Sequence, residues 1–188
     1  MSAAGRYCLV LCVFLAVGAY TGCQQADQVA EIAEGLRSEE EEDRYEAAKR
    51  LEEYVHRAES HLDVIAAGLS DSSARVRYRC AKVLAGMEEA AAPAVNNLAQ
   101  ALADEDSKVR YYAAKALSNL DRKAGPAVPA LIQAASDLDP KTRYYAVKAL
   151  GNIEQDQPEV LEVLKSRQSD EEERVSKAAT SAIKKVSK

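Results

Sequence analysis

Apolar residues recur along most of the chain at a fixed interval of 33 positions. One such set comprises Leu51, Leu84, Leu117, Leu150 and Ile183. A second set comprises Ile32, Ile65, Leu98, Leu131 and Leu164. A repeat of this length is typical of a solenoid, in which each unit packs only on its neighbours. The spacing predicts five consecutive units, at about residues 24–56, 57–89, 90–122, 123–155 and 156–188.

Within each unit the apolar spacing predicts two helices. In the second helix, apolar residues fall three and four positions apart, as they do at Val109, Tyr112, Ala113, Ala116, Leu117 and Leu120. That spacing places them on one wide stripe of a helix. A shorter stripe, Val128, Leu131 and Ala135, indicates the first helix. A single pair of this size cannot cover its own stripe, so we expect neighbouring pairs to bury it for each other.

Polar residues and prolines indicate where the helices begin. Ser73, Ser107 and Asp139 stand where a side chain is expected to cap a second helix. Pro93 and Pro126 are expected to open first helices, because the first turn of a helix does not need the missing N–H.

Tyrosine and lysine also repeat with this period. The tyrosines are Tyr45, Tyr78, Tyr111 and Tyr144. The lysines, each four residues later, are Lys49, Lys82, Lys115 and Lys148. On a helical wheel Tyr111 falls opposite the apolar stripe, with Ser118 beside it. The pattern therefore predicts a row of tyrosines on the solvent side of the second helices.

Two interpretations of this row remain open. Tyrosine is enriched at binding hot spots, so the row predicts a contact surface whose lysines supply charge complementarity. Alternatively, each ring packs on the Lys or Arg stem of the next unit and contributes only to stability. Tyr112 and Tyr145 lie at the edge of the apolar stripe, and we expect them to pack.

The repeated motif is Asp-x-x-x-x-Val-Arg-x-x-Ala-x-x-Ala-Leu, seen at Asp104–Leu117 and closely followed at 71–84. This motif resembles HEAT-like repeats of the phycobilisome-lyase type. The resemblance implies an all-α, right-handed α-solenoid whose second helices line the concave face. It also implies that each arginine pairs, as structural glue, with the loop aspartate of its own or a neighbouring unit. The arginines are Arg44, Arg77, Arg110 and Arg143, and the aspartates are Asp71, Asp104 and Asp137.

The composition and the motifs that are missing narrow the function classes. The chain has 188 residues and a formal net charge of -5, which disfavours a general nucleic-acid binder. The sequence contains no nucleophile elbow, phosphate loop or CxxC pair. His56 and His61 lack partners at metal-ligand spacing, and Cys80 stands where other units have alanine. We therefore expect no enzymatic activity, no cofactor and no metal.

The N-terminus carries an export pattern. Arg6 precedes an apolar run at residues 7–19, which is too short for a membrane span of about 20 residues but suits the apolar core of a signal peptide. Gly22 and Cys23 follow this run. A small residue directly before such a cysteine resembles the lipobox of bacterial lipoproteins.

That resemblance implies a signal peptide at 1–22 and a repeat domain at 23–188 that begins with a lipidated Cys23. The chain would then be anchored to a membrane of the cell envelope, on the extracytoplasmic side. A plain secretory signal cut nearby and an uncleaved anchor are the alternatives.

Together these features predict a membrane-tethered, extracytoplasmic scaffold that binds protein or peptide partners on its concave face. Two alternatives remain, a structural envelope spacer without a specific ligand and a lyase-like HEAT-repeat enzyme.

Overall fold

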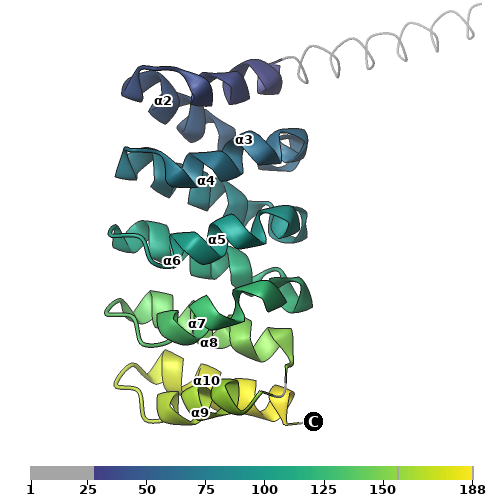
Figure 1. Cartoon of the computed structure of the whole chain (residues 1–188), viewed down its shortest axis with the longest axis vertical. Coiled ribbons are helices and arrows are strands. Elements are labelled where there is room, and N and C mark those ends of the chain that lie inside the picture. Colours follow the sequence, from purple (N-terminus) through teal and green to yellow (C-terminus); the bar gives the residue numbers. More distant parts are fainter. Residues whose placement is uncertain (1–27, 156, 188) are drawn as a thin grey trace, which may run out of the picture.

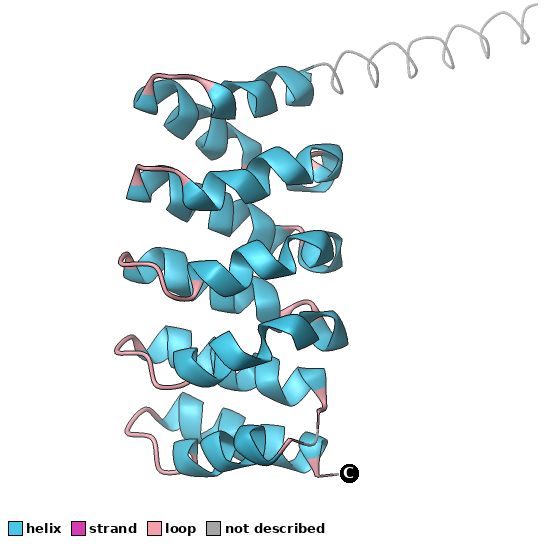
Figure 2. Cartoon of the chain, viewed as in Figure 1, coloured by secondary structure: helices cyan, strands magenta, loops and turns pink. Residues whose placement is uncertain are grey.

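The computed structural model describes residues 28–155 and 157–187, which form helices joined by turns and loops, with no strand among them (Figure 2). The expected signal peptide and Cys23 lie outside the described residues. Within the described part, no helix is both long and apolar enough to cross a membrane.

The described residues form five helix pairs. The first helices are residues 28–34, α3 (Leu62–Ala67), α5 (Val95–Ala101), α7 (Val128–Ala134) and α9 (Pro158–Arg167). The second helices are α2 (Glu41–Leu51), α4 (Ala74–Gly86), α6 (Ser107–Ser118), α8 (Pro140–Ile153) and α10 (Glu173–Val186). Short 3₁₀ segments complete the units: η1 (Gly35–Arg37), η2 (Val55–Arg57), η3 (Glu59–His61), η4 (Gly68–Ser70), η5 (Glu88–Ala94) and η6 (Asp121–Ala127).

The pairs stack in chain order along the long axis of the molecule, from the purple N-terminal end to the yellow C-terminal end (Figure 1). Each second helix packs on the next one, α2 on α4, α4 on α6, α6 on α8 and α8 on α10. The first helices touch one another less extensively. The all-α solenoid predicted from the period of 33 is confirmed.

The core consists of the repeated apolar positions. Leu51, Leu84, Leu117 and Leu150 are buried, and so is the parallel set that runs from Ile32 to Leu164. Ile183, the last member of its set, is only half-buried because no further unit covers it. Cys80 is fully buried at its small-residue position. Burial raises the pKa of this thiol to about 12, so Cys80 is a core residue.

The first helices are shorter than their pattern suggests. Pro93 and Pro126 lie inside the 3₁₀ segments η5 and η6, and α5 and α7 begin only after them. The expectation that these prolines open the first α-helix was wrong. Each 3₁₀ segment accommodates its proline, which cannot donate a backbone N–H, and the short α-helix follows directly after it.

The caps differ in part from the expected residues. Asp139 caps α8, since its carboxylate accepts from the N–H groups of Lys141 and Thr142. In α6 the cap is Asp106, one residue before the expected Ser107. Ser73 stands at the cap position of α4, but its side chain makes no capping bond and its hydroxyl donates to Glu41 instead.

Candidate functional site

Aromatic rings connect the second helices into a continuous row. The ring centroids of Tyr78 and Tyr112 lie 5.5 Å apart, and those of Tyr112 and Tyr111 lie 4.6 Å apart. The row continues from Tyr111 to Tyr145 at 5.6 Å and from Tyr145 to Tyr144 at 5.0 Å. These separations and the tilted rings are those of favourable aromatic pairs. The row therefore includes Tyr112 and Tyr145, which link rings from neighbouring units.

A cation from the following unit lies over each of the four repeated tyrosines. Arg75 lies 4.6 Å from the ring centroid of Tyr45, and Lys108 lies 5.6 Å from that of Tyr78. Lys141 lies 6.0 Å from Tyr111, and Arg174 lies 5.6 Å from Tyr144. We call these four tyrosines and four cations the tyrosine–cation ladder. These four cations also repeat every 33 residues, so the sequence period could have identified them. The lysines four residues after each tyrosine were the only cations that the sequence prediction named for this row.

The four lysines expected beside the tyrosines have different surroundings. Lys49 bonds Glu46 and lies over the Tyr45 ring, whereas Lys82 bonds Glu52. Lys115 and Lys148 lie over the rings of Tyr112 and Tyr145, at 5.8 Å in both cases. The i+4 spacing therefore does not bring these last two lysines over the repeated tyrosines.

The tyrosines are half-buried, and Ser118, which we expected beside Tyr111 on the solvent side, is only 1% exposed. The wheel placed Ser118 wrongly because it divides a helix into a core side and a solvent side. In a stack, the neighbouring second helices also cover both flanks. Only a narrow strip of each second helix then faces solvent, and the cations stand on that strip.

Charge pairing differs between the two halves of this face. In the N-terminal half, Arg75 pairs with Glu41 and Glu42. Arg79 and Lys82 there share Glu52. In the C-terminal half, Lys177 pairs with Glu173, but five other cationic groups of this face contact aromatic rings and form no ion pair among the described residues. These cations are Lys108, Lys115, Lys141, Lys148 and Arg174.

The repeated arginines join each unit to the next. Arg44 donates from Nε to Asp71 at 2.6 Å, and Arg77 donates to Asp104 at 2.7 Å. Arg110 donates to Asp137 at 2.7 Å, and Arg143 donates to Asp170 at 2.9 Å. In every case the aspartate belongs to the following unit, and Nη2 of the arginine makes a second bond to the same carboxylate.

Each arginine also holds its own loop. Nη1 of Arg110 donates to the backbone carbonyls of Asp104 and Glu105, at 3.0 and 3.1 Å. The partner aspartate in turn accepts the N–H of the residue two positions later, as Asp170 does from Glu172. The hydrogen bond from Arg143 is the main cause of a lowered pKa at Asp170 and outweighs the opposing effect of burial. This pattern is that of a structural clamp.

Asparagines add a second link that the repeat pattern did not predict. The side chain of Asn119 donates to the carbonyl of Ala85, and that of Asn152 donates to the carbonyl of Ser118, one unit earlier in each case. At the C-terminal end Lys185 donates to Asn152.

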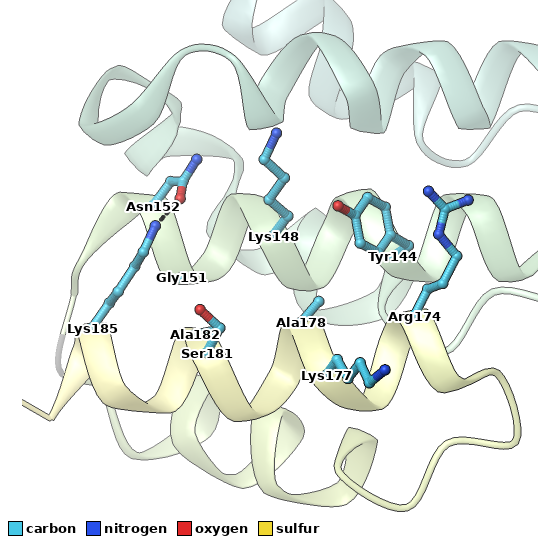
Figure 3. A pocket seen from close by; sticks show the side chains of 10 residues that line it. All are labelled: Tyr144, Lys148, Gly151, Asn152, Arg174, Lys177, Ala178, Ser181, Ala182 and Lys185. Atoms are coloured by element: carbon cyan, nitrogen blue, oxygen red, sulfur yellow. Dashed lines mark hydrogen bonds between the residues drawn. The ribbon is translucent and has the colours of Figure 1, made fainter.

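A groove of about 410 Å³ lies between α8 and α10, at the C-terminal end of the ladder (Figure 3). Tyr144 and Lys148 of α8 line it, together with Arg174, Lys177 and Lys185 of α10. No acidic residue lines the groove. The described residues contain no cluster of His, Cys, Asp or Glu that could hold a metal.

Comparison with known proteins agrees with this architecture. Residues 95–184 match the family of HEAT repeats. No curated protein matches the chain in sequence.

Solved structures resemble the chain in fold. An engineered protein is 24% identical, with a TM-score of 0.73 over 85% of this chain and 79% of its own. A designed armadillo repeat protein in complex with the peptide (KR)4 is 20% identical, with a TM-score of 0.70 over 87% and 86%. The complex of CpcE and CpcF of phycocyanin lyase from Nostoc sp. PCC7120 matches at 24% identity and a TM-score of 0.64, over 82% of this chain and 63% of that one. Residues 95–184 therefore resemble HEAT repeats in sequence, and the described residues have the α-solenoid fold of the designed armadillo repeat proteins.

Proposed function

We propose that this chain is a binding scaffold that holds a peptide or protein segment on the face formed by α4, α6, α8 and α10. The observation that carries the proposal is the tyrosine–cation ladder, which sets aromatic rings and cations in one repeating row along that face. Tyr and Arg supply much of the energy at protein interfaces.

The arrangement of the layers supports this choice of face. The second helices pack on one another more extensively than the first helices do. A stack with one layer more closely packed curves towards that layer, so this contact pattern favours the second helices as the inner side. A concave face surrounds an extended segment more fully than a convex one. Designed armadillo repeat proteins of this fold have been solved for modular peptide recognition, and one was solved with a peptide bound.

The proposal is tested by replacing ladder tyrosines. Peptides that bind the purified chain are selected from a random library. Their affinities are then measured for a variant carrying Tyr78→Ala, Tyr111→Ala and Tyr144→Ala, and for the single variant Tyr111→Ala in case the triple variant is unstable. We expect at least one of the two folded variants to bind the selected peptides about tenfold more weakly.

The matched control is Leu138→Ala, which removes a side chain that is 93% exposed in the loop before α8. This control should bind like the unaltered chain. Equal affinity of the folded ladder variants and the unaltered chain would exclude the ladder as the binding surface. A library that yields no binder would favour the structural spacer instead.

We also propose that the scaffold is exported and tethered to a membrane by lipid on Cys23. This part rests on the apolar run at 7–19 and on the Gly22-Cys23 step. Several acyl chains at one residue would make the attachment effectively permanent. Replacing Cys23→Ser should release the chain from washed membranes or leave it unprocessed. A processed Cys23→Ser chain that still sediments with membranes would rule out lipid attachment at this residue.

A further inference from the structure

We infer that the C-terminal half of the tyrosine–cation ladder binds an extended acidic segment, rich in Asp or Glu, of a partner protein. This inference rests on the proposed binding function and specifies the chemistry of its ligand. The overall charge of the chain does not suggest it, since the formal net charge is -5.

The cations of this half are available to a ligand. Glutamates already pair with the cations of the N-terminal half of the face, at Arg75, Arg79 and Lys82. The cations over Tyr78, Tyr111 and Tyr144, by contrast, lie on ring faces. A cation over a ring keeps most of its charge available to a second partner, because the ring supplies only a quadrupole. Among the described residues, the cations at these three positions therefore form no ion pair with a carboxylate.

The surface is also hollowed beside the rings. A hollow of about 240 Å³ lies beside Tyr111, Tyr144 and Tyr145, with Lys141 and Arg174 among its lining residues. Glu172 is the acidic residue that lines it. The adjoining groove of about 410 Å³ shares Tyr144 and Arg174 with this hollow and adds Lys148 and Lys185 (Figure 3). Lys177 also lines the groove, but it pairs with Glu173. The surface thus combines apolar rings with a line of cations.

The spacing of the cations suits an extended segment. Lys108, Lys141 and Arg174 occupy equivalent positions on three successive second helices, α6, α8 and α10. Packed helices lie about 10 Å apart. An extended peptide advances about 3.3 Å per residue, so three residues cover about the same distance. A segment with an acidic residue at every third position would therefore bring successive carboxylates to successive cations.

The test uses synthetic peptides labelled with fluorescein. One has four repeats of Glu-Gly-Ser, the second has four repeats of Lys-Gly-Ser, and the third has the composition of the first with all glutamates adjacent. Binding to the full chain is followed by fluorescence anisotropy at low and at moderate salt. We expect the spaced acidic peptide to bind most tightly and to weaken as salt increases.

The variant Lys108→Glu with Lys141→Glu should weaken this binding about tenfold. The control is Arg37→Glu with Lys165→Glu, which changes the net charge equally on η1 and on the first helix α9. This control should change the affinity less than twofold. Circular dichroism establishes that both variants fold.

Three results would overturn the inference. In the first, the acidic peptide fails to bind while library-selected neutral or basic peptides bind through the ladder, which leaves the proposed function intact. In the second, both charge variants weaken binding equally, which indicates a response to net charge alone. In the third, anionic lipid vesicles bind through Lys108 and Lys141 and the acidic peptide does not, which would identify a membrane surface as the ligand. Failure of every peptide, selected or designed, would overturn the proposed function as well.

Discussion

At the scale of single residues, one arginine in each of the first four units performs two tasks. Arg110 uses Nε and Nη2 to bind Asp137 of the next unit, and it uses Nη1 to hold two carbonyls of its own loop. A planar guanidinium with five donors suits this arrangement, and a lysine ammonium does not. The motif Val-Arg in the sequence indicated a structural pair. It did not reveal which unit supplied the aspartate, because both choices place an aspartate within reach of the same helix.

Replacing Arg110→Lys should lower the free energy of unfolding by about 2 kcal/mol, since it removes charge-assisted hydrogen bonds at a site that is largely buried. Urea denaturation followed by circular dichroism measures this change. The matched control is Arg122→Lys, because Arg122 forms its ion pair with Glu154 at the surface. Its effect should be clearly smaller than that of Arg110→Lys, because an exposed ion pair contributes little to stability. Equal effects at the two positions would contradict the role assigned to Arg110.

The same clamp predicts a pH dependence. The pKa of Asp170 is lowered in the folded chain, mainly by the hydrogen bond from Arg143. Its contribution to stability is therefore complete above the ordinary Asp pKa of about 4 and is lost as the pH falls through the lowered folded value.

The variant Asp170→Asn should accordingly be less stable than the unaltered chain at neutral pH, and the difference should close as the pH falls below about 4. Urea unfolding at a series of pH values measures the difference. A difference that stays constant down to about pH 2 would show that ionisation of Asp170 does not contribute.

At the scale of helices, periodicity predicted the second helices well and the first helices less well. The stripe from Val109 to Leu120 is long enough to define a helix, and α6 follows it closely. The first helices α5 and α7 are short and are preceded by 3₁₀ segments, whose three-residue period a helical wheel does not register. The wheel also failed for Ser118, because contacts on the flanks of a stacked helix come from residues of other units.

One glycine sets how closely two second helices approach. A Cβ atom added at Gly151 of α8 would lie 2.5 Å from Cβ and 2.8 Å from Cα of Ala182 in α10. The second of these contacts is to backbone, so a change of rotamer cannot relieve it. Gly151→Ala should therefore separate α8 from α10 and destabilise the chain by about 1–3 kcal/mol, despite the higher helix propensity of alanine.

Thermal unfolding checks this prediction. The control is Gly125→Ala, where the close atom is Nε2 of Gln155, the far end of a flexible side chain. We expect that control to change stability by less than about 1 kcal/mol. An unfolding temperature for Gly151→Ala at or above that of the unaltered chain would show that the helices are not in tight contact there.

At the scale of the molecule, the two end units of the described stack each lack one partner of the Arg–Asp clamp. The position equivalent to the aspartates is Ser38 in the first unit, and the position equivalent to the arginines is Ser176 in the last. Neither end can therefore continue the Arg–Asp series onto another copy.

The candidate site was predictable only in part. The sequence showed the row of tyrosines, because the tyrosines repeat within the second helix of the first four units. The alternative interpretation placed a Lys or Arg of the next unit against each ring, and the contacts over Tyr78 and Tyr111 agree with it. It did not identify Lys108 as the cation over Tyr78, because these two residues belong to different units and meet only through stacking. The difference in charge pairing between the two halves of the face was not predicted for the same reason. The ion pairs of Arg79 and Lys82 with Glu52 also join different units. Contacts between units are therefore the information that the repeat pattern alone lacks.

The central claim is that the face of the second helices is the surface where partners bind. Site-specific photo-crosslinking tests it most directly. A benzophenone amino acid is placed at Lys108 or Lys141 on the ladder, and at Arg37 or Lys165 on the first-helix layer, in chains expressed in their native cells. We predict discrete covalent adducts from the two ladder positions and none from the other two. Adducts from Arg37 or Lys165 alone, or none from any position, would contradict the account.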